Sequence, residues 1–266
     1  MDKRLTFIGG GNIAQAILNG LLKSGYAKDS IIVADPSEAQ GEVCKTLGVD
    51  WTQDNAAAVQ DAHVVLLCVK PQLMHSVASA LSGRLGEALV VSVAAGITLK
   101  QLIDWCGTEK VVRSMPNTPA LLGQGMFGLH ASEQVTSSER ELTGVLLGTV
   151  GAIRWFENES DIDAVTAVSG SGPAYFFYLM EAMIDTAESM GLSREAAHEL
   201  VTQTALGAAA MAKAPGADPK SLRVQVTSPN GTTHAACEHL SAGGFDALVH
   251  GALKAARDRS IQLSAS

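Results

Sequence analysis

The sequence predicts an α/β protein in which a doubly wound sheet comes first and an all-helical domain follows. Short β-branched runs alternate with amphipathic segments from Leu5 to about residue 158. These runs are apolar throughout, as strands are in a parallel sheet that helices cover on both faces. Beyond residue 158 no strand pattern appears, and the chain becomes rich in Ala, Leu and Met. We therefore expect one domain at 1–158 and a second at 159–266.

The strands and helices of the first domain are predicted from the spacing of its apolar residues. The expected strands are LTFIG, IIVAD, VVLLCV, LVVSVAAG, KVVRSM and AIRWFE. Amphipathic patterns between them predict helices at 12–24, 38–47, 72–85, 99–105 and 137–150. Alternation of strands and helices is typical of a doubly wound sheet.

The second domain is predicted as packed helices. Helical patterns cover 161–168, 174–191, 194–214, TTHAACEHL and 245–263. The segment SGSGP is expected to interrupt the helical pattern after the first of these helices. Ser193 is expected to cap the helix that follows it. The helix from Ala174 is apolar nearly all round, which predicts burial in a homodimer. The alternative is that the first domain covers it.

Composition excludes several classes of protein. The net charge of −8 argues against a nucleic-acid partner. Apart from the N-terminal segment, whose glycines belong to a turn, the longest apolar run is VVLLCV, which is too short to cross a membrane. The four cysteines form no C-x-x-C pair, which indicates reduced thiols and no metal site. We expect a soluble cytoplasmic protein without a metal.

A glycine-rich turn follows the first predicted strand. Gly9, Gly11 and Ala14 match G-x-G-x-x-A at the start of a helix. Gly9 permits a tight turn, Gly11 lets a pyrophosphate approach the backbone, and the helix N-terminus offers free N–H groups. A turn without a ligand is the alternative. The motif lies in the first βαβ unit, and an acidic residue ends the second strand, which favours a Rossmann dinucleotide site.

That acidic residue is Asp35. A carboxylate here is expected to accept hydrogen bonds from the adenosine ribose and to repel a 2′-phosphate by on the order of 1 kcal/mol or more. Taken alone, Asp35 favours NAD over NADP. Ser37 is still able to bond a phosphate, so the choice between NADH and NADPH stays open.

Three more turns lie at the carboxyl ends of predicted strands, where ligands gather in such sheets. They are VKPQ, VAAG and MPNTP. The two prolines of MPNTP fix the backbone on either side of Asn117 and Thr118. Such stiff loops are suited to holding a nicotinamide, although Lys70 by itself is explained equally well as a solvated charge.

A short polar turn, TSPNGTTHA, interrupts the helical half. Pro229 and Gly231 turn the chain, and Thr232 or Thr233 begins a helix. The first N–H groups of that helix, with the hydroxyls of Ser228, Thr232 and Thr233, predict a nest for a small anion such as a carboxylate. Helix capping explains one hydroxyl and leaves the others without a role.

These motifs resemble those of the pyrroline-5-carboxylate reductase family, in order and spacing and over nearly the whole chain. The shared segments are FIGGGNIAQAI, VKP, VSVAAGITL, MPNTPAL, SGSGPAY and TSPNGTTHAA. The resemblance implies reduction of the ring C=N of 1-pyrroline-5-carboxylate by NADPH or NADH to L-proline, the last step of proline biosynthesis. It also implies a Rossmann domain, a helical dimerisation domain, and a homodimer or a larger homo-oligomer with the substrate pocket at the dimer interface.

The resemblance also assigns roles to residues. It implies that Thr233 is catalytic and hydrogen-bonds the ring nitrogen, and that Ser228 and the N–H groups of residues 231–233 hold the substrate carboxylate. The implied substrate residues are Ser228, Asn230, Gly231, Thr232 and Thr233. The implied cofactor residues are Gly9, Gly10, Gly11, Asn12 and Ile13 at the pyrophosphate, Asp35, Pro36 and Ser37 at the ribose, and Val69, Lys70, Pro71, Ala94, Ala95, Pro116 and Asn117 at the nicotinamide.

Two positions depart from the family pattern. Many relatives have Gly-Gly where this chain has Asn230 and Gly231, so the turn is more constrained. Members that prefer NADPH usually lack a carboxylate at the place of Asp35.

A reductase of this kind needs no metal and no strong acid, because a protonated cyclic imine is already electrophilic. Two rival functions are a β-hydroxyacid dehydrogenase and a nucleotide sensor without activity. The first places a Lys on a helix of the second domain, and this chain has none there before Lys213. The second has no use for the hydroxyls of TSPNGTTHA.

Overall fold

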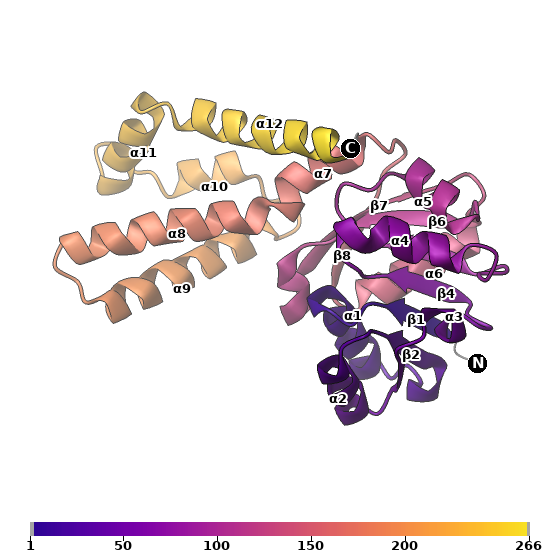
Figure 1. The fold of residues 1–266 in the computed structure, drawn as a ribbon. Coiled ribbons are helices and arrows are strands. Elements are labelled where there is room, and N and C mark those ends of the chain that lie inside the picture. The colour runs from indigo at the N-terminus through magenta and orange to yellow at the C-terminus, as the bar shows by residue number, and fades with distance from the viewer. Residues whose placement is uncertain (1–2, 265–266) are drawn as a thin grey trace. The chain divides into compact units, whose positions relative to one another are not determined.

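The computed structural model describes residues 3–264, which form two compact units (Figure 1). Unit 1 takes in the chain as far as Ser171 together with the C-terminal stretch from Ala256, and unit 2 runs from Gly172 to Ala255. The domain boundary expected at residue 158 lies before this division and stays a prediction. Within residues 3–264 no helix combines the length and the apolar character that a membrane span requires.

Unit 1 is built on one eight-stranded sheet in the order β3-β2-β1-β4-β5-β6-β7-β8. Every neighbouring pair is parallel except β6 and β7, which are antiparallel. The strands are β1 (Leu5–Ile8), β2 (Ile31–Ala34), β3 (Asp50–Thr52), β4 (Val64–Leu67), β5 (Leu89–Ser92), β6 (Val111–Met115), β7 (Gly125–Ala131) and β8 (Gly151–Trp155). The predicted doubly wound α/β class is confirmed, with this one antiparallel pair as a correction.

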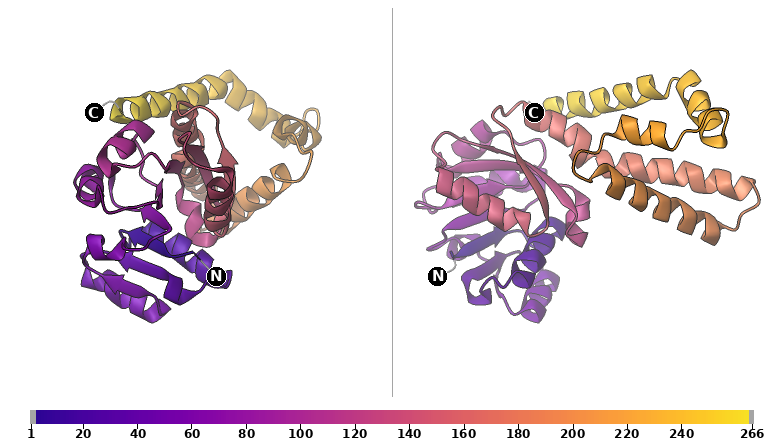
Figure 2. Two further views of the ribbon diagram at one scale, coloured as in Figure 1. Left: turned by 90° about the vertical axis from the view of Figure 1, so that its right-hand side faces the viewer. Right: turned by 180° about the vertical axis from the view of Figure 1, so that it is seen from behind.

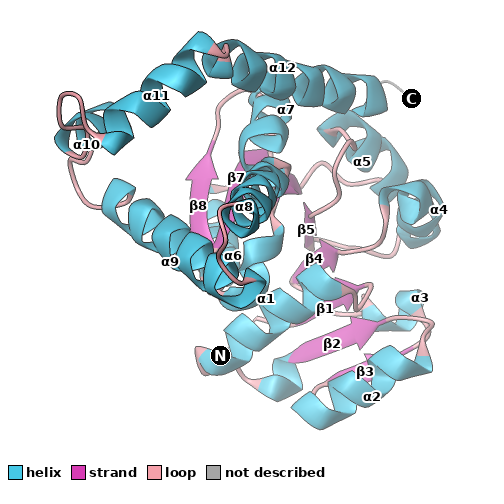
Figure 3. Cartoon of the chain, turned by 90° about the vertical axis from the view of Figure 1, so that its left-hand side faces the viewer, coloured by secondary structure: helices cyan, strands magenta, loops and turns pink. Residues whose placement is uncertain are grey.

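Helices cover both faces of the sheet (Figure 3). One face buries a cluster that includes Phe7, Ile17 of α1 and Leu147 of α6, and the other buries Met74 of α4 and Leu102 of α5. The helices are α1 (Asn12–Lys23), α2 (Glu38–Leu47), α3 (Asn55–Ala58), α4 (Pro71–Leu81), α5 (Leu99–Cys106), α6 (Ser137–Gly148) and α7 (Asp161–Val165), with 3-10 turns η1 (Lys28–Ser30) and η2 (Thr118–Leu122).

Strand β7 was not predicted, because glycines interrupt its apolar run. A Cβ on Gly128 would lie 2.5 Å from Val165 Cγ1, so this strand position has room for no side chain. Gly125 faces Gly151 across the β7–β8 pair, and a Cβ on Gly151 would collide with the Gly125 backbone. Glycines are therefore required in β7 because α7 and β8 pack closely against it, and β-branched residues do not mark this strand in the sequence.

Unit 2 is helical, and Figure 2 shows its long helices from two further sides. Its elements are α8 (Gly172–Ser189), α9 (Arg194–Ala212), α10 (Pro219–Gln225), α11 (Thr232–Ala242) and the first part of α12 (Phe245–Ser264). Helices α8 and α9 pack side by side around Ile184, Ala197 and Val201. Ser193 caps α9 as expected, since its side chain accepts the N–H of Ala196 at 3.2 Å.

The interruption expected at SGSGP takes the form of a π-helix and a bend at Ser171, and no loop separates the helices. α7 passes into a π-helix, η3 (Thr166–Gly170), and α8 begins at Gly172. The Ser169 hydroxyl donates to the Val165 carbonyl at 3.1 Å, so it stabilises the helical path that a serine-rich segment was expected to leave. A wide π turn absorbs the glycines without a loop.

Several large apolar side chains of α8 are exposed in the single chain. Phe176, Phe177 and Tyr178 are 63%, 62% and 74% exposed. Unit 2 by itself does not bury them, as the sequence predicts for a helix that packs against a second copy.

Candidate active site

The predicted cofactor residues all lie in unit 1, just beyond the carboxyl ends of strands. Ligands of doubly wound sheets bind at this edge. Residues 9–13 follow β1, residues 35–37 follow β2, residues 69–71 follow β4, Ala94 and Ala95 follow β5, and Pro116 and Asn117 follow β6. The predicted substrate residues lie together in unit 2, in the turn before α11.

The glycine turn after β1 has the backbone that its sequence predicts. Gly9 has a φ of +96°, and a Cβ there would lie 3.0 Å from the Cys68 carbonyl, so only glycine is accommodated without strain. Gly11 is the N-cap of α1, and no atom lies within 4 Å of the position of a Cβ on it. Ala14 is buried against the sheet at 3% exposure. The turn thus leaves open space in front of the helix N-terminus.

The N–H groups at this helix start are available to an anion. Asn12 and Ile13 are the first two residues of α1, and their N–H groups have no acceptor within the helix. The carbonyl of Gly10 accepts from Gln15 Nε2 at 3.1 Å, and Gln15 also donates to Gln40 at 2.7 Å. These two hydrogen bonds of Gln15 connect the glycine turn to α1 and α2. They were not predicted, because nothing local in the sequence indicates that Gln15 reaches back to the turn.

Asp35 has a structural role that the sequence did not indicate. Its carboxylate accepts the N–H of Gly10 at 2.8 Å and the N–H of Ser37 at 2.9 Å. The carbonyl of Asp35 accepts from Trp51 Nε1 at 3.1 Å. Each carboxylate oxygen has one of its two lone-pair sites taken, so each keeps one for a ribose hydroxyl. Asp35 therefore joins the glycine turn to the start of α2.

Pro36 and Ser37 lead directly into α2. The carbonyl of Pro36 accepts from Gln53 Nε2 at 3.1 Å. Ser37 is the N-cap residue of α2, but its side chain makes no capping hydrogen bond. The exposed hydroxyl of Ser37 is thus placed at a helix start without an internal role there.

The turn after β4 combines a partly buried cysteine with an exposed lysine. Burial raises the pKa of the Cys68 thiol to about 12, so it stays protonated and does not act as a nucleophile. Val69 is half-buried, Lys70 is exposed at the N-cap of α4, and Pro71 occupies the first helical position. Proline is favoured there because that residue needs no intrahelical N–H bond.

Two contacts fix the turn after β5, one at Ala94 and one at Gly96. The N–H of Ala94 donates to the Ser92 hydroxyl at 3.3 Å. Gly96 has a φ of +72°, and a Cβ on it would lie 3.1 Å from Leu263 Cβ in the last turns of α12. The C-terminal end of α12 therefore lies against the loop that carries Ala94 and Ala95.

Asn117 of the MPNTP loop is tied into unit 1 by both ends of its amide. Its Nδ2 donates to the Ser169 carbonyl at 3.0 Å, and its Oδ1 accepts the N–H of Met126 at 2.9 Å. The preceding Pro116 is buried. The side chain of Asn117 thus shapes the loop, and a cofactor role for it stays a prediction.

The polar turn of unit 2 presents three hydroxyls at a helix start. Asn230 has a φ of +60°, a left-handed conformation that asparagine tolerates better than most residues. Gly231 is the N-cap of α11, which begins at Thr232 as predicted, and no side chain caps the helix. The hydroxyls of Ser228, Thr232 and Thr233 form no hydrogen bond within the described part of the chain, so the capping explanation does not account for any of them.

The N–H groups of this turn are only partly available. Gly231 donates its N–H to the Ser228 carbonyl at 3.0 Å, so in this structure it is already used. Thr232 and Thr233 begin the helix and have no intrahelical acceptor. An anion at this turn would therefore meet the two threonine N–H groups first.

No cluster of three or more His, Cys, Asp or Glu side chains able to hold a metal ion is found among residues 3–264. In α11, His234 Nε2 lies 3.5 Å from Glu238 Oε1.

The comparisons with known proteins agree across both units. A family model described as pyrroline-5-carboxylate reductase dimerisation matches residues 159–263, and one described as NADP oxidoreductase, coenzyme F420-dependent, matches residues 4–96. A pyrroline-5-carboxylate reductase of Pseudomonas aeruginosa is 51% identical over 98% of this chain and 97% of its own length. A relative of that name from Pisum sativum is 40% identical over 98% of this chain and 96% of its own length.

Solved structures give the same result. A pyrroline-5-carboxylate reductase of Coxiella burnetii has a TM-score of 0.94 and 40% identity, and covers 99% of both chains. The pyrroline carboxylate reductase of Plasmodium falciparum with NADP bound has a TM-score of 0.88 and 28% identity, over 98% of both chains. The predicted resemblance is confirmed. The chain belongs to the pyrroline-5-carboxylate reductase family.

Proposed function

We propose that this protein reduces the ring C=N of 1-pyrroline-5-carboxylate to L-proline with NADPH or NADH, as the last step of proline biosynthesis. Family membership over nearly the full length supports this reaction. The observation on this chain that supports it best is the turn before α11, where three hydroxyls and two helix N–H groups have no hydrogen-bond partner among residues 3–264. Those groups match the carboxylate and ring nitrogen of this substrate.

The glycine turn of unit 1 suits a dinucleotide. Open space at Gly11 leaves room for a pyrophosphate against the backbone. The free N–H groups of Asn12 and Ile13 are able to donate hydrogen bonds to its negatively charged oxygens. When bound, NAD(P)H supplies the hydride that the imine carbon accepts. The residues proposed to hold its nicotinamide end are those after β4, β5 and β6, including Ala94, Ala95 and Pro116.

The polar turn is proposed to hold and orient the substrate. The N–H groups of Thr232 and Thr233, with the Ser228 hydroxyl, bind the carboxylate, and the Thr233 hydroxyl hydrogen-bonds the ring nitrogen. The ring nitrogen already carries a proton in the iminium form and keeps it in the product. No side chain has to donate a proton in this step, which agrees with a turn made of hydroxyls and N–H groups.

We further propose that the protein works as a homodimer, or as a larger homo-oligomer built from dimers, in the cytoplasm. The match of residues 159–263 to a dimerisation model and the exposed apolar face of α8 support assembly with further copies of the chain. Four free cysteines support a reducing compartment.

Replacement of Asp35 by asparagine is expected to shift the protein toward NADPH. Removing the charge relieves repulsion of a 2′-phosphate, worth on the order of 1 kcal/mol, or about a fivefold change. Asparagine keeps one oxygen for the N–H of Gly10 or Ser37 and loses the other, so affinity for both cofactors falls. The ratio of kcat/KM for NADPH to that for NADH, measured side by side, therefore reports how residue 35 discriminates between a 2′-phosphate and a 2′-hydroxyl. An unchanged ratio would remove Asp35 from cofactor selection.

The reaction itself is tested by following NADPH and NADH absorbance on addition of 1-pyrroline-5-carboxylate, with L-proline detected as product. We expect oxidation of at least one cofactor and equal amounts of L-proline. A nucleotide sensor would bind cofactor and leave the absorbance unchanged. A β-hydroxyacid dehydrogenase would instead oxidise a hydroxyacid with the oxidised cofactor.

A further inference from the structure

A buried guanidinium in the sheet of unit 1 has no part in the proposed site. Arg113 lies in β6 with only 3% of its side chain exposed. Its Nη1 pairs with Glu159 Oε1 at 2.8 Å and its Nη2 faces Asp163 Oδ1 at 3.8 Å. Burial of a cation without partners destabilises a fold by several kcal/mol. The burial of Arg113 therefore depends on these two carboxylates.

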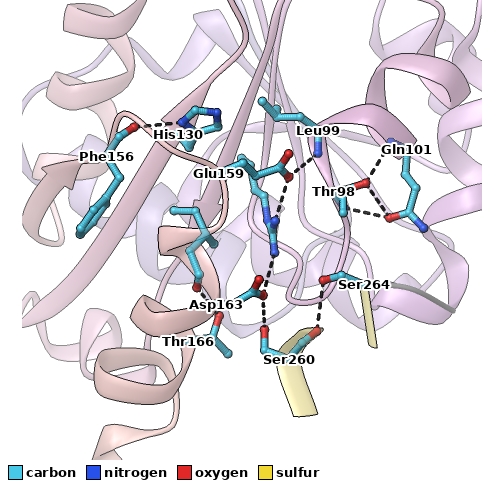
Figure 4. Close-up of polar contacts among 12 residues, drawn as sticks. Thr98, Leu99, Gln101, His130, Phe156, Glu159, Asp163, Thr166, Ser260 and Ser264 are labelled. Carbon is cyan, nitrogen blue, oxygen red and sulfur yellow. Dashed lines mark hydrogen bonds and ion pairs between the residues drawn. The ribbon is translucent and has the colours of Figure 1, made fainter. Parts of the chain in front are cut away.

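Each of the two carboxylates also accepts a hydrogen bond from a further segment of the chain, as Figure 4 shows. Glu159 Oε1 also accepts the N–H of Leu99, the first residue of α5, at 2.7 Å. Asp163 Oδ1 also accepts the hydroxyl of Ser260, in the last turns of α12, at 2.7 Å. Through Glu159 and Asp163, the side chain of Arg113 therefore connects β6 with the start of α5, with α7 and with the end of α12. These elements are far apart in the sequence.

These four segments border the loops proposed to hold the nicotinamide. The loop with Ala94 and Ala95 ends at α5, whose first turn is closed by the Thr98–Gln101 capping box next to the Glu159 contact. Gly96 of that loop packs against Leu263, three residues after Ser260. On the other side, β6 continues from Arg113 into Met115 and the MPNTP loop.

The second loop is fixed to the same elements. Asn117 donates to the carbonyl of Ser169 in η3, the continuation of α7. Gly170 of η3 packs against the end of the Met115 side chain. The segment from Glu159 through α7 to the end of η3 therefore contacts both loops, through Glu159 and Leu99 on one side and through η3 on the other.

We infer that Arg113 is a positioning residue for hydride transfer. With Glu159, Asp163 and Ser260 it sets the loops at 94–98 and 115–117 and the C-terminal end of α12 at fixed distances from one another. The role rests on the proposed function. Arginine is required because its planar fork meets two carboxylates through two different nitrogens, which a lysine ammonium does not reproduce. Misplacement by about 1 Å of a group that orients reactants lowers turnover by up to about 100-fold.

Two variants test the inference, with one matched control. Ser260→Ala removes the hydrogen bond to Asp163 and leaves both ion pairs, and Arg113→Lys keeps the charge and loses the fork. Thr6→Val is the control, because it removes a buried hydrogen bond of the same sheet, from Thr6 to the Ala58 carbonyl at 2.8 Å, away from the network. Each is compared with the wild type in melting temperature, amide hydrogen exchange, NADPH affinity by fluorescence, and kcat.

A positioning role predicts faster amide exchange at 94–106 in both Ser260→Ala and Arg113→Lys, and a kcat lowered by about tenfold in Arg113→Lys. Thr6→Val is expected to melt earlier with kcat and exchange at 94–106 unchanged. If both network variants melt earlier while exchange at 94–106, NADPH affinity and kcat stay as in the wild type, the cluster only stabilises the fold and the inference fails. A wild type without turnover would refute the proposed function and with it a role of Arg113 in hydride transfer, and amide exchange at 94–106 would then decide separately whether the network fixes this loop.

Discussion

Thr233→Ala is expected to lower kcat by about 10- to 100-fold, because it removes the one hydroxyl proposed to meet the ring nitrogen. The side chain is exposed and has no hydrogen-bond partner within the described residues, so the free energy of unfolding is expected to change by less than about 0.5 kcal/mol. NADPH affinity is expected to stay as in the wild type. Steady-state rates and a fluorescence titration with NADPH measure both quantities on one preparation.

Two companion variants separate the hydroxyl from the rest of the side chain. Thr233→Ser keeps the hydroxyl and is expected to recover most of the activity. Thr204→Ala removes an exposed threonine from α9 of the same unit and is expected to behave as the wild type. Wild-type rates in Thr233→Ala would remove Thr233 from the mechanism, and equal losses in Thr233→Ser and Thr233→Ala would assign its role to shape instead of hydrogen bonding.

Gly11→Ala is expected to weaken the binding of both NADPH and NADH by about 10- to 100-fold. The added methyl enters the space in front of α1 and pushes the pyrophosphate away from the N–H groups, each worth about 1.5–3 kcal/mol to a charged partner. The fold tolerates the change, because nothing lies within 4 Å of the new Cβ and φ at Gly11 is −69°. Fluorescence titration gives the affinity, and thermal unfolding gives the stability.

Gly148→Ala is the matched control for this variant. Gly148 ends α6, and a Cβ there also meets nothing within 4 Å. We expect its cofactor affinity to equal that of the wild type. Should Gly11→Ala bind NADPH as tightly as Gly148→Ala does, the pyrophosphate does not lie against this turn. Gly9→Ala is a poorer probe, because its Cβ would crowd the Cys68 carbonyl and disturb the fold itself.

Local patterns were enough to predict most elements. The helix at 38–47 begins and ends where it was expected, since Gly48 in the left-handed region stops it. The helix expected at 72–85 ends at Leu81, because Ser82 has left the helical region with a ψ of 134° and Gly83 follows with a φ of +74°. Strand β3 is three residues long at a sheet edge, and α10 is a short polar helix, so neither shows a clear period.

The segments that carry the predicted site residues were placed by the sequence, but the contacts of their side chains were not. The segments fall at strand ends because the topology places them there, and the motifs mark those ends. What each side chain does within unit 1 depends on partners distant in sequence. Asp35 holds Gly10, 25 residues away, and Asn117 holds Ser169, 52 residues away. Arg113 and Glu159, 46 residues apart, belong to no motif and were not predicted at all.

The division of the chain has a consequence for its synthesis. Unit 1 is assembled from two stretches, one before and one after unit 2. A ribosome adds about 5–20 residues per second, so about 7–30 seconds pass between the emergence of Arg113 and that of Ser260. During this interval the nascent sheet lacks the hydroxyl that Asp163 binds and the side chain that packs on Gly96. The nucleotide-binding half therefore reaches its finished form only after the rest of the polypeptide has been translated.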